Sequence, residues 1–115
     1  EVLLANVPRL WRLPAYRACL PGGPGPCELP YVPPEPYVRA TVAAFNAAIA
    51  RVARAEGAYL VDLSVRRGLP RLVAADGFHP STAGHRRVAA AFGEVMRGAP
   101  LCQRLGGDLS CGHDS

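Results

Sequence analysis

The sequence predicts an α/β fold in which two parallel strands are joined by a helix. Two short apolar runs, "VLLANV" (Val2–Val7) and "AYLVDLS" (Ala58–Ser64), are typical of strands buried on both faces of a parallel sheet. Between them, apolar residues recur at helical spacing. A strand, a helix and a strand in this order predict a right-handed crossover with the two strands parallel. A chain of 115 residues has room for one small core.

The first strand ends at Pro8, and the segment that follows it, residues 8–36, is rich in proline and glycine. It is too long for a plain connection, and we interpret it as an insertion with a functional or covering role. Trp11 and Tyr16 lie in this insertion. They are candidates to line a substrate pocket, and a packed lid over the core is the alternative.

Two amphipathic helices are expected. The first runs from Tyr37 to near Gly57, and its predicted apolar face is Val38, Val42, Phe45, Ile49 and Val52. Asn46 within it is expected to hydrogen-bond a neighbouring loop, and Asp62 to bond or cap at the end of the second strand. The last helix covers residues 82–97, with an apolar side of Val88, Phe92, Val95 and Met96. We therefore divide the chain into a folded part, residues 1–98, and an irregular tail, residues 99–115.

Composition narrows the classes of partner. Half of the residues are hydrophobic and 19% are charged, as in a globular protein. The 13 basic residues are all arginines, give a net charge of +4 and are scattered along the sequence, which favours solvated helix faces over a nucleic-acid site. No apolar stretch approaches the roughly 20 residues of a membrane span, so stable membrane insertion is not expected.

The four cysteines form two local pairs, Cys19 with Cys27 and Cys102 with Cys111. The spacing is unlike that of zinc ligands, which favours two disulfides over a metal site, with free thiols as the remaining alternative. Disulfides predict a secreted or otherwise extracytoplasmic protein. The chain opens directly in "EVLLANV", so we expect the signal peptide on an upstream part.

The stretch "DGFHPSTAG", residues 76–84, carries the candidate catalytic groups. A carboxylate at Asp76 could accept the Nδ1 proton of His79 and leave Nε2 free to take a proton from a nucleophile. Pro80 restricts the backbone beside the ring, and Ser81 is a suitable N-cap for the last helix. The alternative is a capping arrangement with a solvated histidine. His85, one turn further on, is expected to be a surface residue.

The extended stretch "DGFHPSTAGH" resembles the last sequence block of the SGNH/GDSL hydrolases, which has the pattern D-x-x-H-P-[SN]-x-x-G. The order around it is similar too: "LLANVPRLW", a variable loop, "AAFNAAIARVA", "YLVDLS" and then the block. The resemblance covers Val2 to Arg97. It implies a three-layer α/β/α fold with a parallel sheet, of which this chain holds the C-terminal strand-helix-strand-helix portion.

The resemblance further implies a Ser-His-Asp ester hydrolase, an esterase or lipase, with His79 as base and Asp76 as its partner. The family's Gly-Asp-Ser block and its oxyanion-hole Gly and Asn are not found before His79. The nucleophile is therefore expected on a missing N-terminal half, and this chain alone is expected to be inactive. Ser110 and Ser115 are interpreted as part of a polar tail.

The implied substrate is a small-molecule, lipid or carbohydrate ester, and no metal or organic cofactor is expected. Two other classes of protein stay open. One is a non-catalytic α/β binding or interaction domain that keeps the D-x-x-H block. The other is a redox or metal protein that uses the cysteines and histidines.

Overall fold

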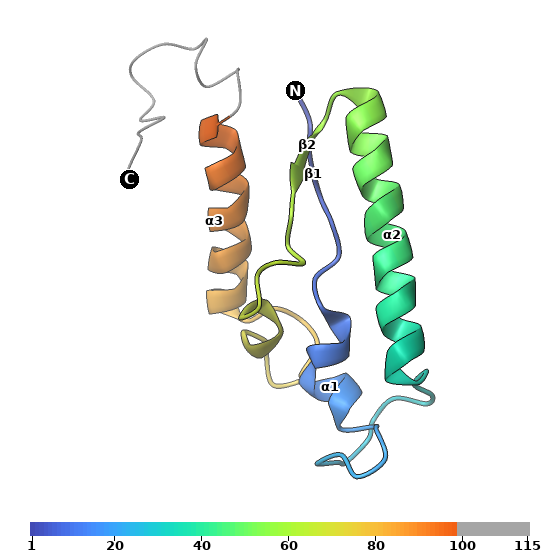
Figure 1. Cartoon of the computed structure of the whole chain (residues 1–115). Coiled ribbons are helices and arrows are strands. Elements are labelled where there is room, and N and C mark those ends of the chain that lie inside the picture. The colour runs from blue at the N-terminus through green and yellow to red at the C-terminus, as the bar shows by residue number, and fades with distance from the viewer. Residues whose placement is uncertain (99–115) are drawn as a thin grey trace.

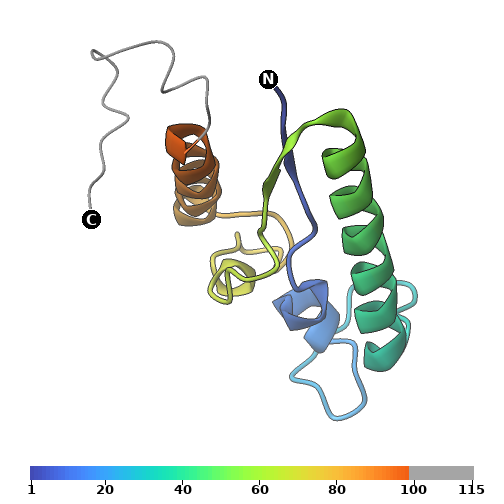
Figure 2. The ribbon, with the colours of Figure 1, turned by 45° about the horizontal axis from the view of Figure 1, so that its top comes forward.

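A computed structural model describes residues 1–98 as three layers, with a short sheet between two long helices (Figure 1). Helix α2 (Glu35–Glu56) covers one face of the sheet and α3 (Thr82–Gly98) the other, in both views (Figure 2). The remaining elements are β1 (Leu3–Ala5), η1 (Leu10–Arg12), α1 (Pro14–Arg17), β2 (Tyr59–Val61) and η2 (Leu69–Arg71). The predicted α/β class is confirmed.

The two strands are parallel, as predicted, with Leu3 opposite Tyr59 and Ala5 opposite Val61. Both are shorter than the apolar runs that predict them. Beyond β1, the side chain of Asn6 provides the hydrogen bonds between the two chain segments. Its Oδ1 accepts hydrogen bonds from the amides of Leu63 (2.7 Å) and Ser64 (3.2 Å). The carboxamide of this buried residue therefore replaces further strand pairing at the carboxyl end of the sheet.

Asp62 bonds at the end of its strand, as expected. Its Oδ1 accepts hydrogen bonds from Asn6 Nδ2 at 2.8 Å and from the hydroxyl of Ser64 at 2.5 Å. Burial raises the pKa of Asp62, but the hydrogen bonds from Ser64 and Asn6 outweigh it and hold that pKa below its ordinary value.

The core lies between the sheet and α3. Its buried members are Val61, Leu63, Leu69 and Ala91, against which Leu3, Ala5, Val88, Phe92 and Val95 pack. Three of the four predicted apolar positions of α3 thus face the core. The fourth, Met96, is 54% exposed, so its prediction was wrong. The small Ala91 is buried in its place, where it lets the helix approach the sheet closely.

Helix α2 begins at Glu35, two residues before the predicted start, because Pro36 is well suited to the first turn of a helix. It ends at Gly57, whose φ of 66° permits the left-handed cap. The predicted apolar face is wrong at Phe45 and Val52, which are 61% and 53% exposed.

The buried side of α2 shares Val42 with the predicted face and adds the smaller Ala53. Val42, Ile49 and Ala53 are at steps of seven and four residues, and Val42 and Ala53 are buried. Asn46 lies between them, accepts a hydrogen bond from the Val7 amide (2.8 Å) and donates one to the Val7 carbonyl (2.9 Å). Its predicted role in bonding a neighbouring segment is confirmed.

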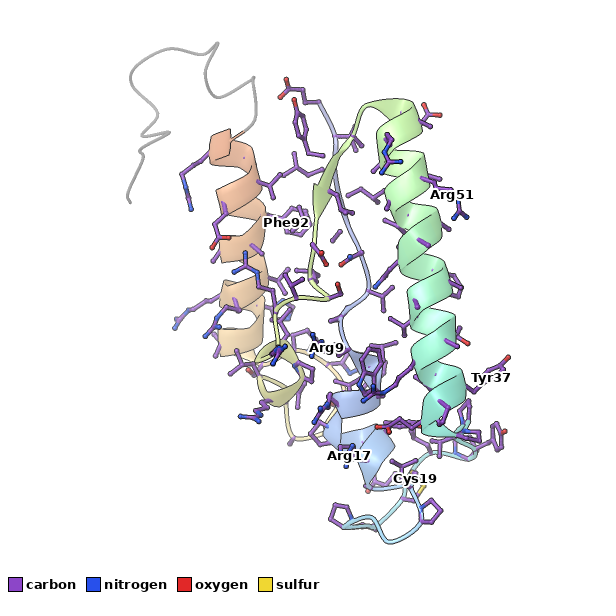
Figure 3. All side chains as sticks on the ribbon, viewed as in Figure 1. Arg9, Arg17, Cys19, Tyr37, Arg51 and Phe92 are labelled. Atoms are coloured by element: carbon purple, nitrogen blue, oxygen red, sulfur yellow. A yellow bond between two sulfur atoms is a disulfide. The ribbon has the colours of Figure 1, made fainter. Side chains whose placement is uncertain are left out.

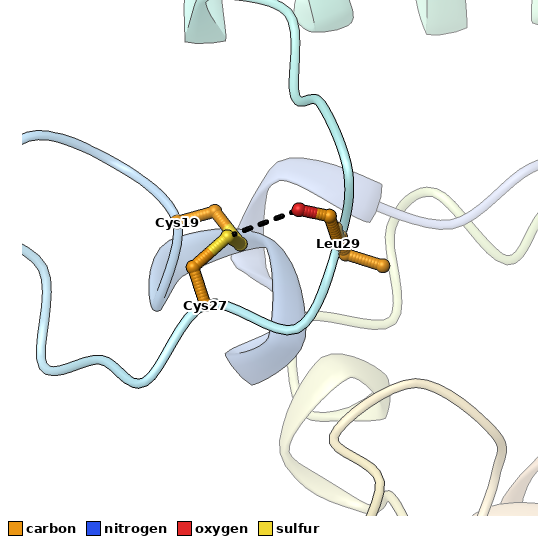
Figure 4. Close-up of a disulfide and its surroundings, with 3 residues drawn as sticks. All are labelled: Cys19, Cys27 and Leu29. Atoms are coloured by element: carbon orange, nitrogen blue, oxygen red, sulfur yellow. Dashed lines mark hydrogen bonds between the residues drawn. A yellow bond between two sulfur atoms is a disulfide. The ribbon is translucent and has the colours of Figure 1, made fainter.

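The insertion, residues 8–36, contains the two short helices η1 and α1. The hydroxyl of the buried Tyr16 donates a hydrogen bond of 2.7 Å to the Pro33 carbonyl. The predicted disulfide between Cys19 and Cys27 is present, with the two Cα atoms 4.6 Å apart (Figure 4). The sulfur of Cys27 also lies 3.4 Å from the Leu29 carbonyl oxygen, a contact without a donated hydrogen because a disulfide sulfur carries none. Cys102 and Cys111 lie outside the described residues.

No helix within residues 1–98 combines the length and the apolar character that crossing a membrane would require.

Candidate active site

The D-x-x-H stretch lies on a closed loop between η2 and α3. The Ala74 amide donates a 2.8 Å hydrogen bond to the His79 carbonyl, and the Ser81 amide donates one of 2.9 Å to the Leu72 carbonyl. Val73 and Pro80 form an isolated antiparallel bridge between these two bonds. Hydrogen bonds between its two ends therefore hold the loop closed on both sides of the candidate residues.

Asp76 and His79 are in direct contact. Nδ1 of His79 lies 2.5 Å from Oδ2 of Asp76, while Oδ1 of Asp76 accepts hydrogen bonds from the amides of Phe78 (2.9 Å) and His79 (3.0 Å). One carboxylate oxygen thus fixes the turn and the other fixes the ring. With the Nδ1 proton directed at the carboxylate, Nε2 of His79 is the nitrogen that can accept a proton.

Electrostatics keep this carboxylate charged. The hydrogen bond from the His79 side chain, followed by the two amide bonds, lowers the pKa of Asp76 to about 2. The imidazole is 72% exposed and stands edge-on to the ring of Phe78, with 5.0 Å between ring centroids. A reacting group can therefore approach it from solvent.

The helix that follows the loop starts as predicted. Ser81 Oγ accepts a hydrogen bond of 3.1 Å from the Gly84 amide, which makes Ser81 the N-cap of α3. Gly84 is buried, and a Cβ there would lie 2.2 Å from the Leu72 carbonyl oxygen, so the block's final glycine is required for close packing. His85 is exposed on the helix surface, as expected.

The interpretation of the sequence missed Gly77. Its φ is 70°, and a Cβ at this position would lie 2.8 Å from the Ala15 amide nitrogen. The same amide donates a hydrogen bond of 3.1 Å to the Gly77 carbonyl. Helix α1 therefore supports the turn that carries Asp76 and His79. The glycine directly after the aspartate was the available signal, since Asp-Gly is typical of turns.

A groove of about 490 Å³ opens beside His79. It lies between the Asp76–His79 loop and the insertion, and its lining residues are Pro14, Ala15, Ala18, Pro26, Glu28, Leu29, Ala75, Asp76, Gly77, Phe78 and His79. Trp11 and Tyr16 do not line it. Tyr16 is buried, and Trp11 lines a different cavity. Their role in substrate binding stays a prediction.

Residues 1–98 contain two serines, and both hydroxyls are engaged elsewhere. Ser64 bonds Asp62, and Ser81 caps α3. Neither hydrogen-bonds His79. Over the same residues, no three histidine, cysteine, aspartate or glutamate side chains group to form a metal site. Chemically, the site is an imidazole oriented by a carboxylate, and within residues 1–98 no serine hydroxyl is hydrogen-bonded to it.

A comparison with known protein families gives a match. The family model described as "GDSL-like Lipase/Acylhydrolase family" matches residues 4–87. This range begins in β1 and ends in the first turns of α3, so it contains the Asp76–His79 loop. No curated protein and no solved structure matches the chain.

Proposed function

This chain belongs to the GDSL-like lipase/acylhydrolase family, and on that basis we propose that Asp76 and His79 are the acid and base of a serine-dependent carboxylic ester hydrolase. The observation that carries the proposal is the 2.5 Å contact between His79 Nδ1 and Asp76 Oδ2. It selects the ring tautomer needed by a general base, and the amide bonds to the same carboxylate hold that geometry.

In the proposed reaction, a serine hydroxyl attacks the ester carbonyl while Nε2 of His79 takes its proton. The imidazolium formed is stabilised by the charged Asp76. The tetrahedral intermediate then collapses, and His79 gives the proton to the leaving alcohol. A water enters, His79 takes its proton, and the attack of the water on the acyl-serine releases the acid and restores the serine.

We place the nucleophilic serine outside residues 1–98, on an upstream part of the same domain. Two observations support this. Both serines of the described residues have structural partners, and β1 pairs with a single strand, β2, in this part of the chain. A further strand could pair with its other edge and bring the serine to His79. The chain of residues 1–115 alone is then expected to hydrolyse no ester.

We propose that the protein works outside the cytoplasm, because Cys19 and Cys27 form a disulfide. The substrate is an ester of a small molecule, a lipid or a carbohydrate. The groove beside His79 would receive it, with Phe78 and Leu29 on its apolar wall.

The test uses the full-length protein, with a p-nitrophenyl ester for turnover and a fluorophosphonate probe to label the nucleophile. His79→Ala should lower kcat/KM by at least about 10³-fold, and Asp76→Asn by about 10²- to 10⁴-fold. His85→Ala is the matched control, because His85 is exposed on α3 and forms no hydrogen bond or ion pair with Asp76 or His79. The labelled residue should be a serine outside residues 1–98.

Wild-type turnover in His79→Ala would refute the assignment. A full-length protein that neither hydrolyses esters nor reacts with the probe would favour the non-catalytic binding domain instead.

A further inference from the structure

Six arginines gather around two adjoining cavities near η1. Arg9, Arg12 and Arg67 line both cavities, Arg39 joins them in the first, and Arg17 and Arg71 join them in the second. We call these six residues the arginine cleft. The cavities measure about 620 and 410 Å³. In Figure 3, Arg9 and Arg17 both lie beside the short helices of the insertion.

The fold, and not local sequence, assembles this cleft. Arg12 belongs to η1, Arg39 to α2 and Arg71 to η2, while Arg67 precedes η2. Scattered arginines along the sequence predict solvated side chains, and five of the six are exposed, but the crossover brings them together from distant segments.

Little negative charge opposes these six cations. No aspartate or glutamate lines either cavity. Arg17 forms an ion pair with Glu35 at 3.6 Å. Ser64, which lines the first cavity, donates a hydrogen bond from its hydroxyl to Asp62. Arg12, Arg67 and Arg71 form no ion pair within residues 1–98.

The side chains that do have partners are held in place by them. Arg9 Nε donates a 2.9 Å hydrogen bond to the Ser64 carbonyl, and the guanidinium of Arg39 lies 5.1 Å from the ring centroid of Trp11. These contacts order two of the guanidinium groups before any ligand arrives, which lowers the entropy cost of binding.

We propose that the arginine cleft binds an anion that carries two or more phosphate or sulfate groups. Guanidinium groups bind such oxyanions through paired, charge-assisted hydrogen bonds. The combined space suits a ligand larger than one phosphate. A single oxyanion would engage only some of the six guanidinium groups, whereas several linked oxyanions could bridge both cavities.

This site is separate from the proposed ester site, because neither cavity shares a lining residue with the groove beside His79. Helix α1 divides them: Pro14 and Ala15 line the groove, whereas Arg17 lines the cleft. Binding in the cleft does not require that Asp76 and His79 be catalytic.

The experiment is calorimetric titration of the full-length protein at low ionic strength with inorganic tripolyphosphate, a multiply sulfated heparin disaccharide and orthophosphate. The cleft variant is Arg12→Gln/Arg67→Gln/Arg71→Gln. The matched control is Arg51→Gln/Arg54→Gln/Arg97→Gln, which removes the same charge from exposed positions in the C-terminal halves of α2 and α3, away from η1 (Figure 1).

We expect tripolyphosphate or the sulfated disaccharide to bind at least about tenfold more tightly than orthophosphate, and the tighter of the two identifies the group recognised. The cleft variant should weaken that binding by at least about tenfold, and the control variant by less than about twofold. Equal weakening by both variants, or equal affinity for all three probes, would overturn the proposal. If the triple cleft variant does not fold, Arg12→Gln and Arg71→Gln are each expected to weaken binding about threefold, and wild-type affinity in both would overturn it.

Discussion

At His79, the carboxylate that orients the ring also holds the backbone on which the ring stands. Asp76 uses Oδ1 for the amides of Phe78 and His79, and Oδ2 for the imidazole. The three-residue spacing makes this possible, because an aspartate that opens a turn faces the amides two and three residues ahead. The capping and the catalytic interpretations of the D-x-x-H pattern are therefore compatible: the same turn serves both.

The first prediction concerns the titration of Asp76. Its pKa in the folded chain is about 2, below the ordinary 3.8, so its stabilising contacts are complete above pH 4 and are lost as the pH falls through about 2. Carboxyl carbon NMR should give a midpoint near 2. In His79→Ala the midpoint should move toward 3.8, because the largest cause of the shift is removed. A wild-type midpoint near 3.8 would contradict the dyad geometry.

At the scale of elements, the contact between α1 and the turn that carries Asp76 and His79 gives the second prediction. Gly77→Ala should destabilise the protein by about 2–4 kcal/mol, because it adds a close contact with the Ala15 amide to the strain of a positive φ. Gly57→Ala is the control: its φ is 66°, but nothing lies within 4 Å of a Cβ there, so about 1 kcal/mol is expected.

Urea unfolding measures both free energies, and ester turnover of the full-length protein gives a second readout. Only Gly77→Ala should lower turnover, since the turn it distorts carries His79. Equal losses of stability in the two variants would show that close packing of α1 against the turn does not add to the cost of Gly77→Ala.

The two strands and the two long helices were predictable, but η1, α1 and η2 were not, and the faces that the long helices bury were only partly so. Apolar spacing locates α2, but it cannot tell that Ala53 and Asn46 face the sheet while Phe45 and Val52 face outward. On this side of the helix, the Asn46 side chain hydrogen-bonds the main chain of Val7. Likewise, no local pattern shows that Asn6 replaces strand pairing beyond β1, since that depends on the crossover that places Leu63 beside it.

At the scale of the whole molecule, a motif in the sequence predicts one candidate site and not the other. Asp76 and His79 are near in sequence, so a motif could find them. The arginine cleft joins residues from 9 to 71, so only the folded chain reveals it. Trp11, a candidate from the sequence to line a substrate pocket, lies next to Arg39 and lines the first cavity of the arginine cleft.

The third prediction concerns the disulfide that closes the insertion. Cys19→Ser/Cys27→Ser should lower the free energy of unfolding by about 2–3 kcal/mol, because the loop between these cysteines would no longer be closed in the unfolded chain. Chemical unfolding of this variant measures the loss. Non-reducing peptide mapping of the wild type should find Cys19 linked to Cys27, and it also tests the predicted pairing of Cys102 with Cys111. Alkylatable thiols at Cys19 and Cys27 in the native protein would contradict this prediction.

The side chain of Asn6 has a consequence for how the molecule opens and closes in solution. Amide hydrogens exchange slowly with deuterium when their hydrogen bonds break only in a concerted opening. The amides of Leu63 and Ser64 lie beyond the last paired residue of β2, yet both donate to Asn6 Oδ1. The amides of Leu63 and Ser64 should therefore exchange as slowly as those of the sheet, and not as fast as those of a loop. The Asn6 carboxamide thus extends the unit that opens cooperatively from the two strands toward η2.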